Sequence, residues 1–159
     1  MRYFLQYIHI CLIAFFLYSC KTVNPNAEIP QPAISKDYSI SFIENATLSY
    51  LIEKAKTENK LIFLDFYADW CGPCKVMDRE VFQKKSVGDF FNEHFINFKV
   101  DAEKGGGPTL ASLYEVTGYP TVVFIDPNGV VLNRQAGLIY EEQLMSLAEQ
   151  SIHLYKISS

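Results

Sequence analysis

Two cysteines separated by two residues, Cys71 and Cys74, are the side chains of this chain best suited to covalent chemistry. They stand in the segment Trp70-Cys71-Gly72-Pro73-Cys74, where Pro73 suits the first turn of a helix, since its missing N–H costs little there. With this spacing at a helix start, both sulfurs lie on one face and can close a disulfide ring. The unpaired N–H groups and the positive dipole end of the helix favour a thiolate. We therefore expect Cys71, at the exposed end, to attack a substrate disulfide and Cys74, one turn inside, to resolve the mixed disulfide.

The elements that must position this pair follow from the hydrophobic pattern. The nearly continuous apolar run Leu61–Tyr67 predicts a strand buried on both faces, and a helix is expected from about Cys71 towards Val81. The turn signal Asp126-Pro127-Asn128-Gly129 predicts that residues 130–134 pair back against a strand at 121–125. The other expected elements are a helix containing Leu48 to Ala55 and capped by Asn45 or Thr47, a short helix around Phe90 and Phe91 capped by Ser86, a strand at 95–100, a short helix at 108–114 and a last helix at 140–154. This order predicts an α/β fold with a mixed sheet and helices on both faces.

Two stretches carry a resemblance to a known family. The stretch Asp65–Lys75 resembles the active-site strand and helix of the thioredoxin family, and Gly118-Tyr119-Pro120-Thr121 resembles the loop in which that family carries a cis-proline. The Asp-Trp-Cys start of the motif and the turn at Asp126 also resemble thioredoxin-like domains of periplasmic disulfide-reducing systems. The resemblance covers about residues 40–155. It implies a thioredoxin-like three-layer α/β/α sandwich with a central mixed sheet.

The resemblance also implies a substrate-binding loop. Pro120, in a cis peptide bond, would face the cysteine pair, and the backbone of its neighbour Tyr119 would bind an extended substrate segment. Trp70, with Gly72 and Pro73 beside it, would support the active site by shielding the disulfide and offering an apolar docking surface. The alternatives are a trans proline that merely opens the next strand and a tryptophan that only packs.

By the same resemblance, Asp65 matches the family's buried carboxylate beneath Cys74. Burial raises the pKa of a carboxyl, so Asp65 would accept or return a proton as Cys74 exchanges. The alternative is a polar residue satisfied at a strand end. The chain also departs from the pattern: our alignment places Asn97 where many thioredoxins carry a lysine near this carboxylate, Tyr119 replaces a smaller aliphatic residue, and the loop 102–108 is longer.

The N-terminus reads as a targeting segment. Arg2 is followed by an apolar stretch that ends Leu17-Tyr18-Ser19-Cys20, which resembles a bacterial lipobox. We expect residues 1–19 to be a lipoprotein-type signal peptide, Cys20 to be lipidated and residues 20–37 to form a flexible, proline-containing tether before a thioredoxin-like domain at 38–159. The alternatives are an uncleaved membrane anchor, a signal peptide without lipid and, at Tyr38–Ile43, a folded strand.

Composition excludes several other functions. The net charge of −4 argues against a nucleic-acid partner that relies on a basic face, and one Cys-x-x-Cys pair with no matching histidines provides no zinc site. No flavin or nicotinamide motif is present, so we expect no cofactor beyond the Cys71–Cys74 disulfide. We also expect a separate electron donor upstream of this protein.

The functional hypothesis is a thiol–disulfide oxidoreductase that faces the periplasm, is held at a bacterial membrane by its lipid and reduces disulfides in cell-envelope proteins. Its alternatives are a net oxidase or isomerase and a non-catalytic binding module.

Overall fold

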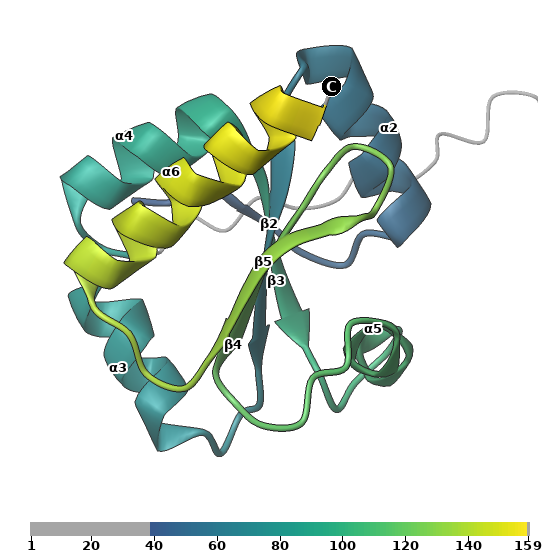
Figure 1. Ribbon diagram of the computed structural model, residues 1–159. Coiled ribbons are helices and arrows are strands. Elements are labelled where there is room, and N and C mark those ends of the chain that lie inside the picture. The colour runs from purple at the N-terminus through teal and green to yellow at the C-terminus, as the bar shows by residue number, and fades with distance from the viewer. Residues whose placement is uncertain (1–38, 159) are drawn as a thin grey trace, which may run out of the picture. The chain divides into compact units, whose positions relative to one another are not determined.

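The computed structural model describes residues 39–158, which form a five-stranded sheet between layers of helices (Figure 1). The strand order is β1 (Phe42–Ile43), β3 (Phe95–Asp101), β2 (Leu61–Tyr67), β4 (Thr121–Ile125) and β5 (Val131–Ala136). β2 lies in the middle because it pairs in parallel with β3 and antiparallel with β4. The strand that leads into the cysteine motif is therefore held by a neighbour on each edge, and the predicted mixed sheet is confirmed.

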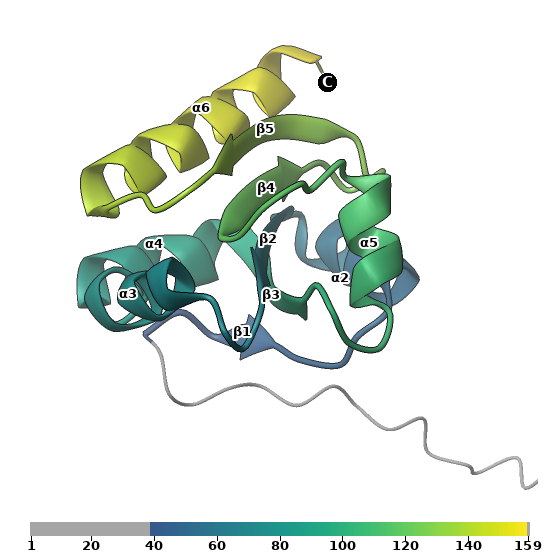
Figure 2. The same cartoon turned by 90° about the horizontal axis from the view of Figure 1, so that it is seen from below.

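Alternate side chains of the central strands face opposite helix layers. Phe63 and Phe124 belong to a core shared with one set of helices, whereas Leu64 and Val123 belong to a core on the other face. The first set is α3 (Gly72–Glu80), α4 (Lys85–His94) and α6 (Glu141–Ser158), and the second is α2 (Leu48–Glu58) and α5 (Gly107–Leu113). Figure 2 shows these two layers on either side of the sheet. The predicted three-layer α/β/α sandwich is confirmed.

The capping residues predicted for two helices have different outcomes. Thr47 caps α2, because its Oγ1 accepts a hydrogen bond from the Tyr50 N–H, whereas Asn45 lies before the helix with a left-handed backbone. The predicted Ser86 cap is wrong: α4 begins at Lys85, and the Ser86 hydroxyl donates instead to Glu141 of α6. Ser86 is the second residue of α4, after the N-cap Lys84, so it lies past the position from which a side chain caps the helix.

The edges of the domain also differ in detail from the expectation. Within the stretch 38–43, the strand alternative holds for Phe42 and Ile43, which pair in parallel with Asn97 and Phe98. The last helix runs to Ser158 and is longer than expected. The predicted signal peptide (1–19), the predicted lipidation at Cys20 and the predicted tether (20–37) all fall outside the described residues. Among residues 39–158, no helix combines the length and the apolar character needed to cross a bilayer.

Candidate active site

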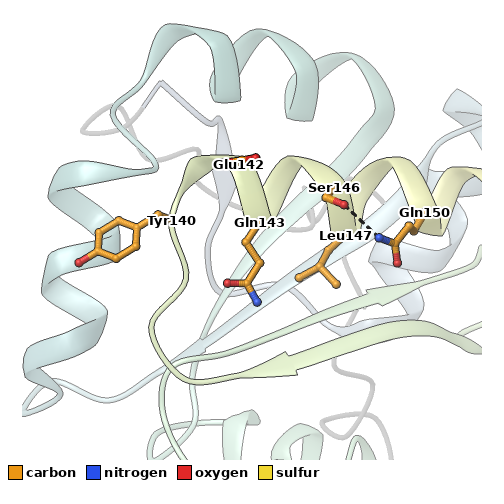
Figure 3. Close-up of a pocket in the computed structure, with 6 residues that line it drawn as sticks. All are labelled: Tyr140, Glu142, Gln143, Ser146, Leu147 and Gln150. Atoms are coloured by element: carbon orange, nitrogen blue, oxygen red, sulfur yellow. Dashed lines mark hydrogen bonds between the residues drawn. The ribbon is translucent and has the colours of Figure 1, made fainter.

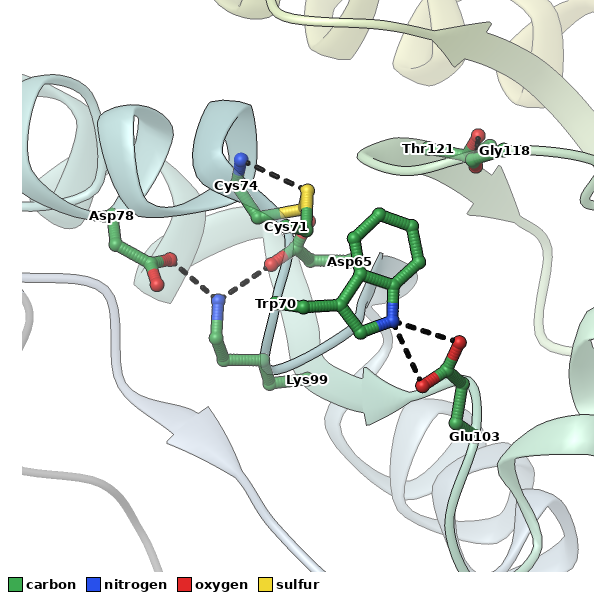
Figure 4. The surroundings of a disulfide bond; sticks show 9 residues. All are labelled: Asp65, Trp70, Cys71, Cys74, Asp78, Lys99, Glu103, Gly118 and Thr121. Carbon is green, nitrogen blue, oxygen red and sulfur yellow. Dashed lines mark hydrogen bonds and ion pairs between the residues drawn. A yellow bond between two sulfur atoms is a disulfide. The ribbon is translucent and has the colours of Figure 1, made fainter.

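The cysteine pair lies where β2 ends and α3 begins. Cys71 is the N-cap of α3, and its Sγ accepts a hydrogen bond from the Cys74 N–H at 3.1 Å (Figure 4). The two cysteines form a disulfide with their Cα atoms 5.3 Å apart. Pro73 occupies the first turn, as expected, and no atom lies within 4 Å of a Cβ built on Gly72. The start of the helix is thus open to solvent beside a sulfur that receives a backbone N–H.

The exposure of Cys71 differs from the expectation. In the disulfide state Cys71 is 1% exposed and Cys74 is 3% exposed, so the predicted exposed attacking cysteine is wrong for this state. The reason is local packing: both sulfurs form a small cluster with Ala68, and Tyr119 packs against that cluster. Neighbouring side chains therefore cover Cys71 while the disulfide is closed.

The loop before β4 brings an aromatic ring to the pair. The Tyr119–Pro120 peptide bond is cis, so the alternative of a trans proline is wrong. The register pairs Phe66 with Thr121, which puts Pro120 level with Tyr67, at the end of β2 that leads to the cysteines. The Thr121 hydroxyl donates to the Gly118 carbonyl at 2.8 Å and closes the turn.

A buried ion-pair network lies under α3. Lys99 Nζ donates to Asp65 Oδ2 at 2.7 Å and to Asp78 Oδ1 at 2.6 Å (Figure 4). Asp65 is 1% exposed, whereas the Asp78 side chain is 23% exposed. Asp78 follows Cys74 by four residues on α3, which places the two on one helix face. The network therefore lies beneath the face of α3 that carries Cys74, and it reaches solvent through Asp78.

The lysine of this network corrects our alignment. Asn97 does not replace the lysine partner of the buried carboxylate, because Lys99, two residues further along β3, fills that role. Side chains alternate along a strand, so both residues lie on the same face, and the parallel register pairs Lys99 with Asp65. The Asn97 amide instead donates to the Phe91 carbonyl at 3.4 Å. The lysine that seemed to be missing beside the buried carboxylate is therefore present.

Burial and neighbouring charges set the ionisation of this network. Burial raises the pKa of Asp65 above its ordinary value of 3.8, the Lys99 charge and hydrogen bond offset part of that rise, and the Asp78 charge adds to it. Burial alone lowers the pKa of Lys99, but the charges and hydrogen bonds of Asp65 and Asp78 raise it above 10.5. Asp65 Oδ1 is buried and accepts no hydrogen bond from any residue in 39–158. One oxygen of Asp65 is thus paired and the other is free to hold a proton.

Trp70 is held by a residue that the sequence analysis did not single out. The Trp70 indole N–H donates to both carboxylate oxygens of Glu103 at 3.0 Å (Figure 4). The Trp70 ring also lies 6.0 Å from the Tyr119 ring. The side chain is 69% exposed, so the alternative of a purely packing tryptophan is wrong. Glu103 belongs to the loop after β3, which the sequence marked only as long.

One surface cavity lies away from the cysteines. It has a volume of about 510 Å³, runs along α6 and is lined by Tyr140, Glu142, Gln143, Ser146, Leu147 and Gln150 (Figure 3). Among residues 39–158, no group of three or more histidine, cysteine, aspartate or glutamate side chains could hold a metal ion.

Comparisons with known proteins agree with this geometry. The thioredoxin-like domain model matches residues 48–152. A thiol:disulfide interchange protein DsbD from a Pseudomonas strain is 30% identical over 98 residues, which cover 61% of this chain and 17% of DsbD. The chain thus spans less than a fifth of that relative. A thioredoxin from Mycoplasmoides gallisepticum is 32% identical over 99 residues, or 60% of this chain and 89% of the thioredoxin.

Solved structures give the same assignment. A Bacteroides thetaiotaomicron chain described as a candidate disulphide-isomerase has 36% identity and a TM-score of 0.65, over 74% of this chain and 97% of its own. The oxidised C-terminal domain of DsbD from Neisseria meningitidis has 25% identity and a TM-score of 0.54, over 65% of this chain and 90% of its own. With its cis-proline loop and its Cys-Gly-Pro-Cys disulfide at the start of α3, this chain belongs to the family of thioredoxin-like domains.

Proposed function

We propose that this protein is a thiol–disulfide oxidoreductase that reduces disulfides in cell-envelope proteins through Cys71 and Cys74. The observation that carries the proposal is the Cys71 sulfur at the N-cap of α3, where it accepts the Cys74 N–H at 3.1 Å. The same contact, together with the positive end of the helix, stabilises negative charge on this sulfur when the disulfide is reduced.

The reaction consists of two exchanges. The Cys71 thiolate attacks one sulfur of the substrate disulfide, a mixed disulfide forms, and the first substrate thiolate leaves and takes up a proton. Cys74 then loses its proton and attacks the Cys71 sulfur. The second substrate thiol leaves, and the Cys71–Cys74 disulfide forms. Two electrons pass to the substrate, and a separate donor must return two electrons to the pair.

Asp65 is the proton acceptor in this proposal. A carboxylate with a raised pKa can take the Cys74 proton and return it in the reverse exchange. Its free oxygen Oδ1 supports this role. Trp70, Gly72 and Pro73 frame the disulfide, while Tyr119 and Pro120 border the place where an extended substrate segment would lie.

The cellular setting is also part of the proposal. The lipobox-like sequence ending at Cys20 supports export, lipidation and anchoring at a bacterial membrane with the domain facing the periplasm. The similarity to DsbD supports partners among disulfide-bearing or thiol-bearing envelope proteins, with an electron donor upstream.

Insulin reduction tests the activity. Dithiothreitol is the electron source, and precipitation of the freed insulin chains reports turnover. We expect the protein to accelerate precipitation and the Cys71→Ser variant to lose the acceleration. If both proteins precipitate insulin only at the background rate, a non-catalytic binding module explains the fold better than an oxidoreductase.

Equilibration with glutathione measures the reduction potential of the Cys71–Cys74 pair and so tests whether the protein reduces or oxidises its substrates. A strongly oxidising potential would favour a net oxidase.

The second candidate function is disulfide isomerisation, favoured by the name of the Bacteroides chain that is 36% identical. Scrambled ribonuclease separates the two candidates. An isomerase restores ribonuclease activity without net reduction, whereas a reductase mainly yields reduced ribonuclease.

A further inference from the structure

We infer that Trp70 and Glu103 form a cation-selecting corner, which favours substrate segments with an arginine or lysine next to the reacting cysteine. This inference rests on the proposed function and adds a substrate class to it. The corner is defined by the exposed Trp70 indole and the Glu103 carboxylate that accepts its N–H through both oxygens (Figure 4). Trp70 directly precedes the attacking cysteine, so a group held here is a near neighbour of the substrate sulfur.

The first argument is the fixed orientation of the indole. An aromatic side chain that is 69% exposed would normally sample several rotamers, but here one bifurcated hydrogen bond, 3.0 Å to each Glu103 oxygen, holds one edge. The Tyr119 ring lies 6.0 Å from it at an interplanar angle of 60°. A surface that is already ordered loses less conformational entropy when a partner docks, so more of the contact energy remains for binding.

The second argument is the electronic state of the ring. Donation of the indole N–H to an anion increases electron density on the ring face, and cations are attracted to that face. A carboxylate has about four lone-pair sites, of which the indole uses two. Glu103 can therefore accept from a guanidinium or ammonium group that lies on the Trp70 face. Both parts of the corner recognise the same kind of side chain.

The third argument is the local charge. Lys104, the cation nearest in sequence, is paired with Asp69 and with Asp101, the latter at 3.0 Å. Within residues 39–158, no lysine, arginine or histidine forms an ion pair with Glu103. Three carboxylates against one ammonium give this loop cluster a net charge of −2. A basic partner group would balance that charge, whereas an acidic one would be repelled.

Reduction of matched peptide disulfides tests the inference. Three dimers of acetyl-Gly-Cys-X-Gly-amide carry arginine, glutamine or glutamate at X, and dithiothreitol regenerates the protein dithiol after each turnover. Each enzymatic rate is divided by the rate at which dithiothreitol alone reduces the same peptide, because the neighbouring charge also alters the reactivity of the peptide sulfur. We expect kcat/KM for the arginine peptide to exceed that for the glutamine peptide by about fivefold at low salt, mainly through KM. The preference should fall by at least half at high salt, because the corner is exposed.

Three variants decide whether the corner is responsible. Glu103→Gln retains an acceptor for the indole but removes the charge, and the arginine-to-glutamine ratio should fall close to one. Glu103→Ala should lower kcat/KM for all three peptides as well, since the indole loses its partner. Glu149→Gln removes the same charge from α6 and should retain the wild-type ratio.

The possible failures are distinguishable. A wild-type protein that reduces all three peptides equally well, or a Glu103→Gln variant that keeps the full arginine preference, would overturn the corner while leaving the proposed function intact. A protein that reduces none of the peptides, nor insulin, would overturn the proposed function itself.

Discussion

Lys99 and Asp65 are direct partners on neighbouring parallel strands, and their side chains form a buried ion pair of 2.7 Å. Lys99 also reaches Asp78, which lies one helical turn beyond Cys74. Asp65, the proposed proton acceptor, is thus coupled to a lysine and, through it, to a second carboxylate with access to solvent.

The first prediction concerns the pH dependence of stability. Burial raises the pKa of Asp65 in the folded state, so between its ordinary value of 3.8 and that raised value the folded protein binds more protons than the unfolded chain. Asp65 therefore makes the free energy of unfolding fall as pH rises through this window, by at most about 1.4 kcal/mol per pH unit. Asp65→Asn removes this contribution. Urea unfolding from pH 4 to 9 should show a stability difference between variant and wild type that moves in favour of the variant as pH rises. If the stability difference between Asp65→Asn and wild type stayed constant with pH, Asp65 would not be the source of this pH dependence.

The second prediction concerns the loss of Lys99. Lys99→Met leaves the Asp65 charge buried without its partner, which should cost about 3 kcal/mol at pH 8. At pH 4.5 the cost should be smaller, because the carboxyl can take up a proton instead. The double variant Asp65→Asn/Lys99→Met should recover most of the loss at pH 8. Additive losses in the double variant would contradict direct coupling between the two residues.

The third prediction concerns the loop that carries Glu103. A Cβ on Gly107 would lie 1.7 Å from the Asp101 carbonyl oxygen, whereas a Cβ on Gly106 would meet no atom within 4 Å. Gly107→Ala should therefore destabilise the protein by about 2 kcal/mol, and the matched Gly106→Ala should change stability by about 0.5 kcal/mol or less. Thermal or urea unfolding measures both. Similar effects of the two substitutions would show that this close approach does not hold the loop.

The fourth prediction concerns the division of roles between the cysteines. Cys74→Ser removes the resolving thiol, so mixed disulfides through Cys71 should persist. The variant should retain partner proteins from an envelope extract that dithiothreitol releases, and the Cys71→Ser variant is the control. If the Cys71→Ser control captured as many partner proteins through Cys74 as the Cys74→Ser variant captures through Cys71, the assigned order of attack would be contradicted.

Local patterns predicted most of this architecture. The apolar run of β2, the proline in the first turn of α3 and the Asp126–Gly129 turn each specify their element through neighbouring residues. The cysteine pair and the cis-proline loop were predicted because short motifs carry them. These features depend on interactions within a few residues of the chain.

The rest depends on contacts between distant segments. The partner of Asp65 was misplaced because the register of two parallel strands is set by the whole sheet, and a shift of two residues preserves the face. Glu103 was missed because its hydrogen bond to Trp70 spans 33 residues and leaves no local pattern. The burial of Cys71 depends on packing by Tyr119, which comes from another loop.

The most direct test of the central claim follows the two thiols by mass spectrometry, with iodoacetamide alkylation before and after a peptide disulfide is added to the reduced protein. We expect Cys71 to be alkylated faster than Cys74. After exchange, both residues should escape alkylation because they are joined to each other, while two peptide thiols appear. Two thiols of equal, slow reactivity that remain alkylatable after the peptide disulfide is added would contradict it.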